Sequence, residues 1–131
     1  MAIQDDVTGL QHVGIPTNDV EGTMKFYESL GFKKAGLFKF DNDSKNDAFM
    51  RLGNLTIETW DGDPTAKEDG AINHISLNTP DIEKAFSDAK EAGLNLVDKE
   101  IQTIPTFWKN GIKYFNIYGP NHEKIEFCQI L

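Results

Sequence analysis

LQHVGI at residues 10–15 and INHISL at residues 72–77 are two copies of one pattern, with a histidine third in each copy. After each copy an aspartate, a glutamate and a glycine recur at the same offset of 62 residues, and the two glycines are Gly31 and Gly93. Self-similarity at a fixed offset is the sequence signature of duplicated structural units. The sequence therefore predicts two similar modules, with His12 and His74 at the same strand position in each.

Each copy opens with a short strand that leads into a helix. We expect the first helix to begin at Asn18, with Glu21 completing a capping box. In the second copy Thr79 can cap the helix and Pro80 suits its first turn. Three strand-like segments follow each helix, at residues 32–40, 48–52, 55–60, 94–98, 112–118 and 124–130.

The length of 131 residues suits one compact domain built of two small modules that share a core. We place the modules at about residues 8–62 and 70–131, and residues 61–70 read as the linker between them. Residues 101–110 are less regular and are expected to form a loop over the site. The order of strands and helices predicts an α+β fold with curved mixed sheets around a cavity.

Composition excludes several classes of partner. The net charge of −8 disfavours nucleic acid and anionic membranes, which are bound by basic patches. Arg51 is the one arginine, and the lysines are scattered along the chain. The single cysteine, Cys128, fits a reducing compartment, and the sequence shows neither a signal peptide nor a membrane span. We therefore expect a cytoplasmic protein.

A second matched pair appears when the strands are sorted by face, because successive strand residues point to opposite faces. Glu58 and Glu126 each follow an isoleucine in the last strand of their module. Their offset is 68, so the second module needs six more residues than the first, and residues 101–110 are a natural place for them. We expect the apolar face of each strand to cover the helix and the other face to carry His12, His74 and both glutamates.

These four side chains are a candidate metal site. A single strand histidine or glutamate is more often exposed to solvent or satisfied by a neighbour than bound to a metal. The four residues taken as a set favour a metal site, because two carboxylates crowded on one face repel each other and a divalent cation would offset that repulsion. Neutral imidazole with carboxylate suits Zn, Ni, Fe or Mn. The third histidine, His122, lies in a turn sequence and is expected to point to solvent.

Four strings carry a resemblance to a known family: LQHV at residues 10–13, FYESLGF at 26–32, INHI at 72–75 and GPNHEKIE at 119–126. The chain resembles the vicinal oxygen chelate superfamily, which includes glyoxalase I, bleomycin-resistance proteins and extradiol dioxygenases, over nearly its whole length. The resemblance implies two βαβββ modules whose curved sheets enclose a metal site. In the glyoxalase-I-like subgroup, the ligands of one divalent metal ion would be His12, Glu58, His74 and Glu126.

The resemblance also implies an activity. We expect a metal-dependent lyase or isomerase like glyoxalase I, which moves a proton through a metal-bound enediolate on a small oxygenated substrate. Glu126 is our choice for the catalytic base, with Glu58 nearly equivalent. Bacterial glyoxalase I has a glutathione-binding arginine where this chain has Pro16. We therefore do not expect dependence on glutathione.

Substrate contacts are expected from one cationic and several aromatic or polar side chains. Arg51 shares a strand face with Phe49 and could bind an anionic group, although an exposed Arg51 fits the sequence equally well. Phe107 and Tyr118 are further pocket candidates, and some of the aromatic residues could simply fill the core. The expected substrate-binding residues are Arg51, Trp60, Trp108, Tyr114 and Asn116.

Two other functions fit the sequence. One is an iron-dependent extradiol-type dioxygenase in which Glu58 does not bind the metal. The other is a metal-free protein of the bleomycin-resistance type that sequesters small molecules. In all three cases the partner is a small molecule, and we expect a homodimer, because members of this family pair their modules within one chain or across two.

Overall fold

The computed structural model describes residues 3–6, 8–39, 45–70 and 72–131, and the chain divides into two compact units, Met1–Thr65 and Ala66–Leu131. The first unit (module 1) forms a mixed sheet in the order β1-β4-β3-β2, with β1 parallel to β4 and the other pairs antiparallel. Its elements are η1 (Ile3–Asp5), β1 (Val13–Pro16), α1 (Val20–Ser29), β2 (Lys33–Lys39), β3 (Asn46–Leu52) and β4 (Leu55–Trp60).

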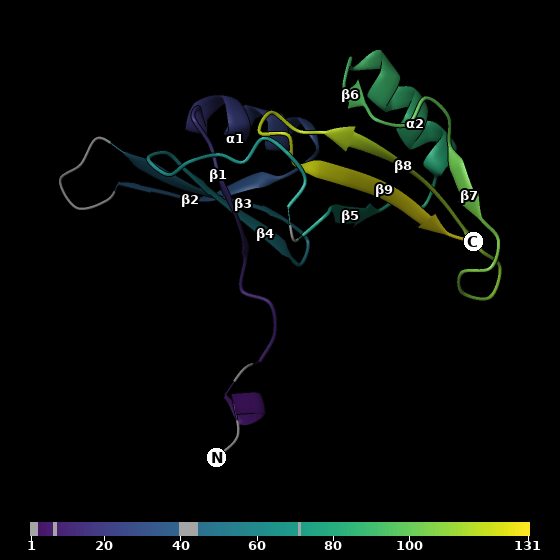
Figure 1. Cartoon of the computed structure of the whole chain (residues 1–131), viewed down its shortest axis with the longest axis horizontal. Helices are drawn as coiled ribbons and strands as arrows, with labels where there is room; N and C mark the ends of the chain where they lie inside the picture. Colours follow the sequence, from purple (N-terminus) through teal and green to yellow (C-terminus); the bar gives the residue numbers. More distant parts are fainter. Residues whose placement is uncertain (1–2, 7, 40–44, 71) are drawn as a thin grey trace. The chain divides into compact units, whose positions relative to one another are not determined.

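The second unit (module 2) repeats this plan with the order β5-β9-β8-β6 and with β5 parallel to β9 (Figure 1). A short strand, β7, pairs with β8 beyond the end of β6. The elements are β5 (Ile75–Asn78), α2 (Ile82–Glu91), β6 (Asn95–Leu96), β7 (Gln102–Ile104), β8 (Ile112–Tyr118) and β9 (Lys124–Ile130). The expected α+β fold of two βαβββ modules is confirmed, with the second strand of module 2 divided into β6 and β7.

Both helices begin one or two residues later than expected. The N-cap residues are Asp19 and Asp81, whose carboxylates accept from the backbone N–H of Gly22 at 2.9 Å and of Lys84 at 3.1 Å. The predicted caps at Asn18 and Thr79 were therefore wrong. Thr79 instead accepts a hydrogen bond from the N–H of Asp81, because its hydroxyl closes the turn that precedes the helix.

Each helix covers the apolar face of its own sheet. In module 1, α1 packs on β3 and β4, where Met50 and Ile57 are fully buried. In module 2, α2 packs on β8 and β9, and Phe86 lies edge-on against Phe115 at 5.0 Å between ring centroids. The alternation seen in the sequence is thus realised in both sheets, because burying one face of each strand leaves the next residue on the opposite face.

The extra residues of module 2 lie in two places. Lys33 on β2 and Asn95 on β6 occupy equivalent positions in the two sheets and are 62 residues apart in the sequence. Their pairing partners, Arg51 on β3 and Tyr118 on β8, are also equivalent but are 67 residues apart. Five of the six extra residues therefore lie between β6 and β8, in the segment that holds β7 and the following loop. The offset of 68 at the glutamates places the sixth residue in the turn before β9.

A membrane-spanning helix is not found among residues 3–6, 8–39, 45–70 and 72–131: none of the helices there is long and apolar enough.

Replacing Ile57 by alanine should lower the free energy of unfolding by about 2–5 kcal/mol, because the change leaves a cavity between β4 and α1. The control is Leu37→Ala on β2, where the side chain is 47% exposed and the expected change is within about 0.5 kcal/mol. Urea unfolding followed by circular dichroism measures both. Equal losses would contradict the assignment of the core to this face.

Candidate metal and substrate site

In module 1 a histidine and a glutamate meet at one end of the parallel strand pair. His12 directly precedes β1, and Glu58 lies on β4 beside Gly14 of β1. The Nε2 atom of His12 is 3.0 Å from Oε1 of Glu58, and the glutamate side chain is 20% exposed. The edge of the imidazole ring also packs against Phe49 of β3, the cross-strand partner of Glu58.

Module 2 repeats the arrangement with looser contact. His74 directly precedes β5, and Glu126 lies on β9 beside Ser76 of β5. The Nε2 atom of His74 is 3.8 Å from Oε2 of Glu126, whose side chain is 15% exposed. The hydroxyl of Ser76 donates to the other oxygen of Glu126, Oε1, at 2.7 Å.

An amide side chain fixes the orientation of each imidazole ring. Nδ1 of His12 bonds to the side-chain oxygen of Gln11, and Nδ1 of His74 bonds to that of Asn73 at 2.9 Å. An amide oxygen only accepts, so these contacts put a proton on Nδ1, and in the neutral imidazole the lone pair of Nε2 is then available to bind a metal ion. In both modules Nε2 faces a carboxylate, and either a proton or a metal ion can lie between the two atoms.

The donor atoms fit a divalent cation. His12 Nε2 and Glu58 Oε1 are 3.0 Å apart, so both atoms could bind one divalent ion, and imidazole with carboxylate is a ligand pair that suits Zn, Ni, Fe or Mn. Among the described residues no three His, Cys, Asp or Glu side chains lie close enough together to hold a metal ion. Each module thus provides two of the four expected ligands by itself.

Asp47 of β3 adds a second carboxyl group beside Glu58. The pKa of Asp47 is raised to about 7, mainly by burial and then by the hydrogen bond to Glu58 and the charge of Glu58, while the nearby His12 lowers it. Its Oδ1 atom is buried without a hydrogen-bond partner. Asp47 and Glu58 together can therefore hold one proton at neutral pH.

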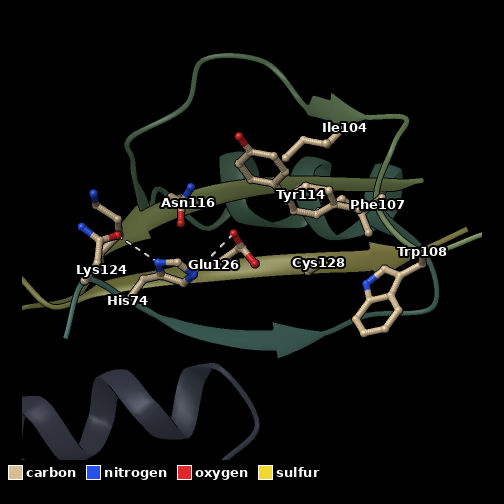
Figure 2. A pocket seen from close by; sticks show the side chains of 11 residues that line it. His74, Ile104, Phe107, Trp108, Tyr114, Asn116, Lys124, Glu126 and Cys128 are labelled. Carbon is tan, nitrogen blue, oxygen red and sulfur yellow. Dashed lines mark hydrogen bonds and ion pairs between the residues drawn. The ribbon is translucent and has the colours of Figure 1, made fainter.

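Module 2 contains a cavity of about 530 Å³ on the sheet face that carries Glu126 (Figure 2). Trp108, Tyr114 and Asn116, three of the expected substrate contacts, line it together with both His74 and Glu126. The Nδ2 group of Asn116 donates to Asp98 at 3.0 Å, while its Oδ1 is buried without a hydrogen-bond partner.

The remaining expected contacts lie in module 1. Arg51 is exposed, and its Nε–H donates to the hydroxyl of Thr56 at 3.1 Å across the sheet. Trp60 lies on the same face as Glu58, and its indole N–H donates to Asp63 at 2.7 Å. In module 1 the structure thus brings His12 together with Glu58. In module 2 it brings His74 and Glu126 together with Trp108, Tyr114 and Asn116.

His122 does not point freely to solvent as the turn sequence suggested. It is part-buried, has a left-handed backbone with φ of 65°, and stacks on Tyr118 at 3.9 Å between ring centroids. Stacking on the aromatic ring covers the imidazole, so that expectation was wrong. Neither His122 nor Tyr118 is among the residues that line the cavity.

Several side chains of the site were missed at the sequence level. Asp47 could have been found by parity, because it is two residues before Phe49 on the strand that pairs with Glu58. The amides at Gln11 and Asn73 could have been found by aligning the two copies, since each directly precedes its histidine. Lys124 and Cys128 share the strand face of Glu126 by parity, and the structure shows that both line the cavity.

Comparison with known proteins gives one family. The sequence profile of the Glyoxalase/Bleomycin resistance protein/Dioxygenase superfamily matches residues 11–112. The uncharacterized protein YwbC of Bacillus subtilis (strain 168) is 31% identical, over 92% of this chain and 96% of the relative.

Two solved structures illustrate the similarity of the fold. A glyoxalase family protein from Enterococcus faecalis superposes with a TM-score of 0.73 at 20% identity, covering 92% of this chain and 96% of that one. The fosfomycin resistance protein FosX from Listeria monocytogenes, complexed with Mn(II) and sulfate, has a TM-score of 0.73 at 16% identity, covering 95% and 94%. At these identities the likeness establishes the fold.

Replacing Asp47 by asparagine should stabilise the metal-free protein more at pH 8 than at pH 5. The folded-state pKa lies above the ordinary value of 3.8, so the stability of the native protein falls as pH rises from about 4 to about 7, and asparagine removes that loss. Because Asp47 is partly exposed, solvent screens the effect, and we expect about 1 kcal/mol, or roughly 4 °C in melting temperature.

The measurement is thermal unfolding in the presence of a chelator, with the exposed Asp5→Asn as the matched control. A melting-temperature change for Asp47→Asn that is the same at both pH values would contradict the arrangement of Asp47 beside Glu58.

Proposed function

The chain belongs to the Glyoxalase/Bleomycin resistance protein/Dioxygenase superfamily, and within it we propose that the protein is a divalent-metal-dependent lyase or isomerase like glyoxalase I. The proposed substrate is a small oxygenated molecule, and the proposed reaction moves a proton next to a carbonyl group. The metal would be Ni, Zn, Fe or Mn.

One observation carries this proposal. In both modules the imidazole bonds an amide oxygen through Nδ1 and faces a carboxylate through Nε2, at 3.0 Å in module 1 and at 3.8 Å in module 2. A proton could separate one such pair, but the same arrangement at equivalent positions of a duplicated fold favours a shared ligand. A divalent cation that takes both pairs would have His12, Glu58, His74 and Glu126 as its ligands.

The residues around the ligands support proton transfer. A bound divalent ion would supply Lewis-acid chemistry, since it stabilises negative charge on a substrate oxygen. Glu126 lines the cavity and is our choice for the base, and the hydroxyl of Ser76 holds its Oε1 atom in place. Glu58 is the other candidate, and Asp47 beside it can keep or release a proton.

A metal-free binding protein is the second candidate, because the cavity of module 2 carries aromatic side chains at its edge. Phe107 is 50% exposed and Trp108 is 73% exposed. Such rings could stack on a small flat molecule without any chemistry. The metal content of the protein separates this function from the first.

We also propose that the working form is a homodimer. Each module holds only two of the four ligands, so a complete site needs two modules, either of one chain or of two. The partners are then a small-molecule substrate and a second copy of the chain.

Metal binding is the first test. Protein purified without an affinity nickel column should contain, or take up, about one divalent ion per site, as measured by elemental analysis. His74→Ala should weaken metal binding at least about tenfold, because it removes a ligand. The control is His122→Asn, which keeps a residue that tolerates the left-handed backbone and should leave metal affinity unchanged. Equal effects of both changes, or no metal uptake, would refute the proposed function.

Activity tests the role of the glutamate. With saturating metal and hemithioacetals of methylglyoxal as substrates, Glu126→Gln should lower kcat by about 100-fold or more, because an amide cannot take up the proton. We expect turnover with thiols other than glutathione. Glu58→Gln is the matched comparison and should cost less. A larger loss for Glu58→Gln would move the base to Glu58.

A further inference from the structure

The geometry points to module 2 as the half of the protein that binds the apolar group of the substrate, and to that group being flat and uncharged, of the size of a phenyl ring. This inference rests on the proposed function in one respect only, which is the binding of the oxygen-bearing end of the substrate. The apolar subsite is built entirely from residues of module 2.

The cavity has a polar end and an apolar end (Figure 2). His74, Asn116, Lys124 and Glu126 gather at one end, beside the proposed ligands. Ile104, Phe107, Trp108 and Ile112 form the other end, and Tyr114 and Cys128 lie between the two groups on β8 and β9. A ligand that fills this cavity therefore needs oxygen atoms at one end and apolar surface at the other.

The apolar end is formed largely by the extra residues of module 2. Phe107 and Trp108 lie in the segment between β7 and β8, within the stretch that is five residues longer than its counterpart in module 1. Both side chains are at least half exposed, and Trp108 has a left-handed backbone with φ of 55°. Exposing two large rings and holding a tryptophan in this conformation both cost free energy, which stacking on an apolar ligand would offset.

Module 1 fills the equivalent place with its own side chain. The strand registers show that Trp60 on β4 occupies the same position as Cys128 on β9, and that Gly14 on β1 occupies the same position as Ser76 on β5. A Cβ atom on Gly14 would lie 3.0 Å from the indole of Trp60, so the glycine is what lets this ring lie over β1. In module 2 the small side chain of Cys128 leaves that volume to the cavity.

Charge and volume define the class of ligand. Lys124 supplies the one ammonium group among the described lining residues, and Asp69 already binds it at 3.0 Å. A ligand with several carboxylates would therefore find little compensation. A buried cavity of about 150 Å³ is enough for benzene, so about 530 Å³ holds a ring together with a short oxygenated chain.

Two hydroxamates test this inference, because they share the same pair of chelating oxygens and differ only in the apolar group. Metal-loaded protein should bind benzohydroxamate at least about tenfold more tightly than acetohydroxamate by isothermal titration calorimetry, because only the first buries a ring. Phe107→Ala and Trp108→Asn should each lower this ratio at least about threefold. The control is Leu37→Ala, which removes an exposed apolar side chain from module 1.

Introducing the glycine and tryptophan of module 1 at the equivalent positions of module 2 should fill the apolar subsite with a side chain. In the double variant Ser76→Gly and Cys128→Trp the two hydroxamates should bind about equally, whereas Ser76→Gly alone should keep the preference. Equal affinities in the unaltered protein, or a preference that survives the double variant, would overturn the inference.

A metal-free comparison separates this inference from the proposed function. Ligand-observed NMR of the metal-free protein should show that acetophenone binds more tightly than acetone. The Trp108→Asn variant should bind acetophenone more weakly than the unaltered protein does. If the protein takes up no metal and still prefers acetophenone, the proposed function fails while the apolar subsite stands. If metal binds but neither phenyl compound is preferred, the subsite is refuted and the metal site stands.

Discussion

In each module an imidazole Nε2 faces a carboxylate oxygen, and the rest of the site is arranged around this pair. Parallel pairing of β1 with β4 and of β5 with β9 sets the glutamate beside the strand that follows the histidine. The amide oxygens of Gln11 and Asn73 bond Nδ1 of each ring and so orient Nε2 toward the carboxylate. Each module thus carries one histidine and one glutamate of the proposed cation site within its own fold.

The residues around the histidine–glutamate pair differ between the two modules. On β4 the large ring of Trp60 lies over Gly14. On β9 the equivalent residue is the small Cys128, and the hydroxyl of Ser76 on β5 binds Glu126. Asp47 gives module 1 an additional carboxyl group, and module 2 has Tyr114 at the equivalent position. Both modules therefore have the same arrangement of histidine and glutamate, while the neighbouring positions differ: a second carboxyl group lies beside Glu58 in module 1, and a cavity lies beside Glu126 in module 2.

Much of the fold could be predicted because burial imposes a period on the sequence. Alternation in β3, β4, β8 and β9 identified the helix-covered face, and the bounds of β4, β8 and β9 agree with the segments expected. Prediction failed where the competing signals were local and equal. Asn18 and Asp19 both suit an N-cap, and only the backbone conformation selects Asp19. The three residues of β7 have no pattern of their own and form a strand only because β8 offers an edge beside them.

The sequence by itself determined the duplication, the two helix-covered sheets and the residue types of the metal-ligand candidates, because these depend on offsets and on strand parity. Only the tertiary structure decided the contacts between neighbouring strands. It brought Asp47 to Glu58, raising its pKa, placed Lys124 and Cys128 in a cavity with Trp108, and turned His122 onto Tyr118. Strand register and ring packing set these contacts, and both depend on residues that are distant in the chain.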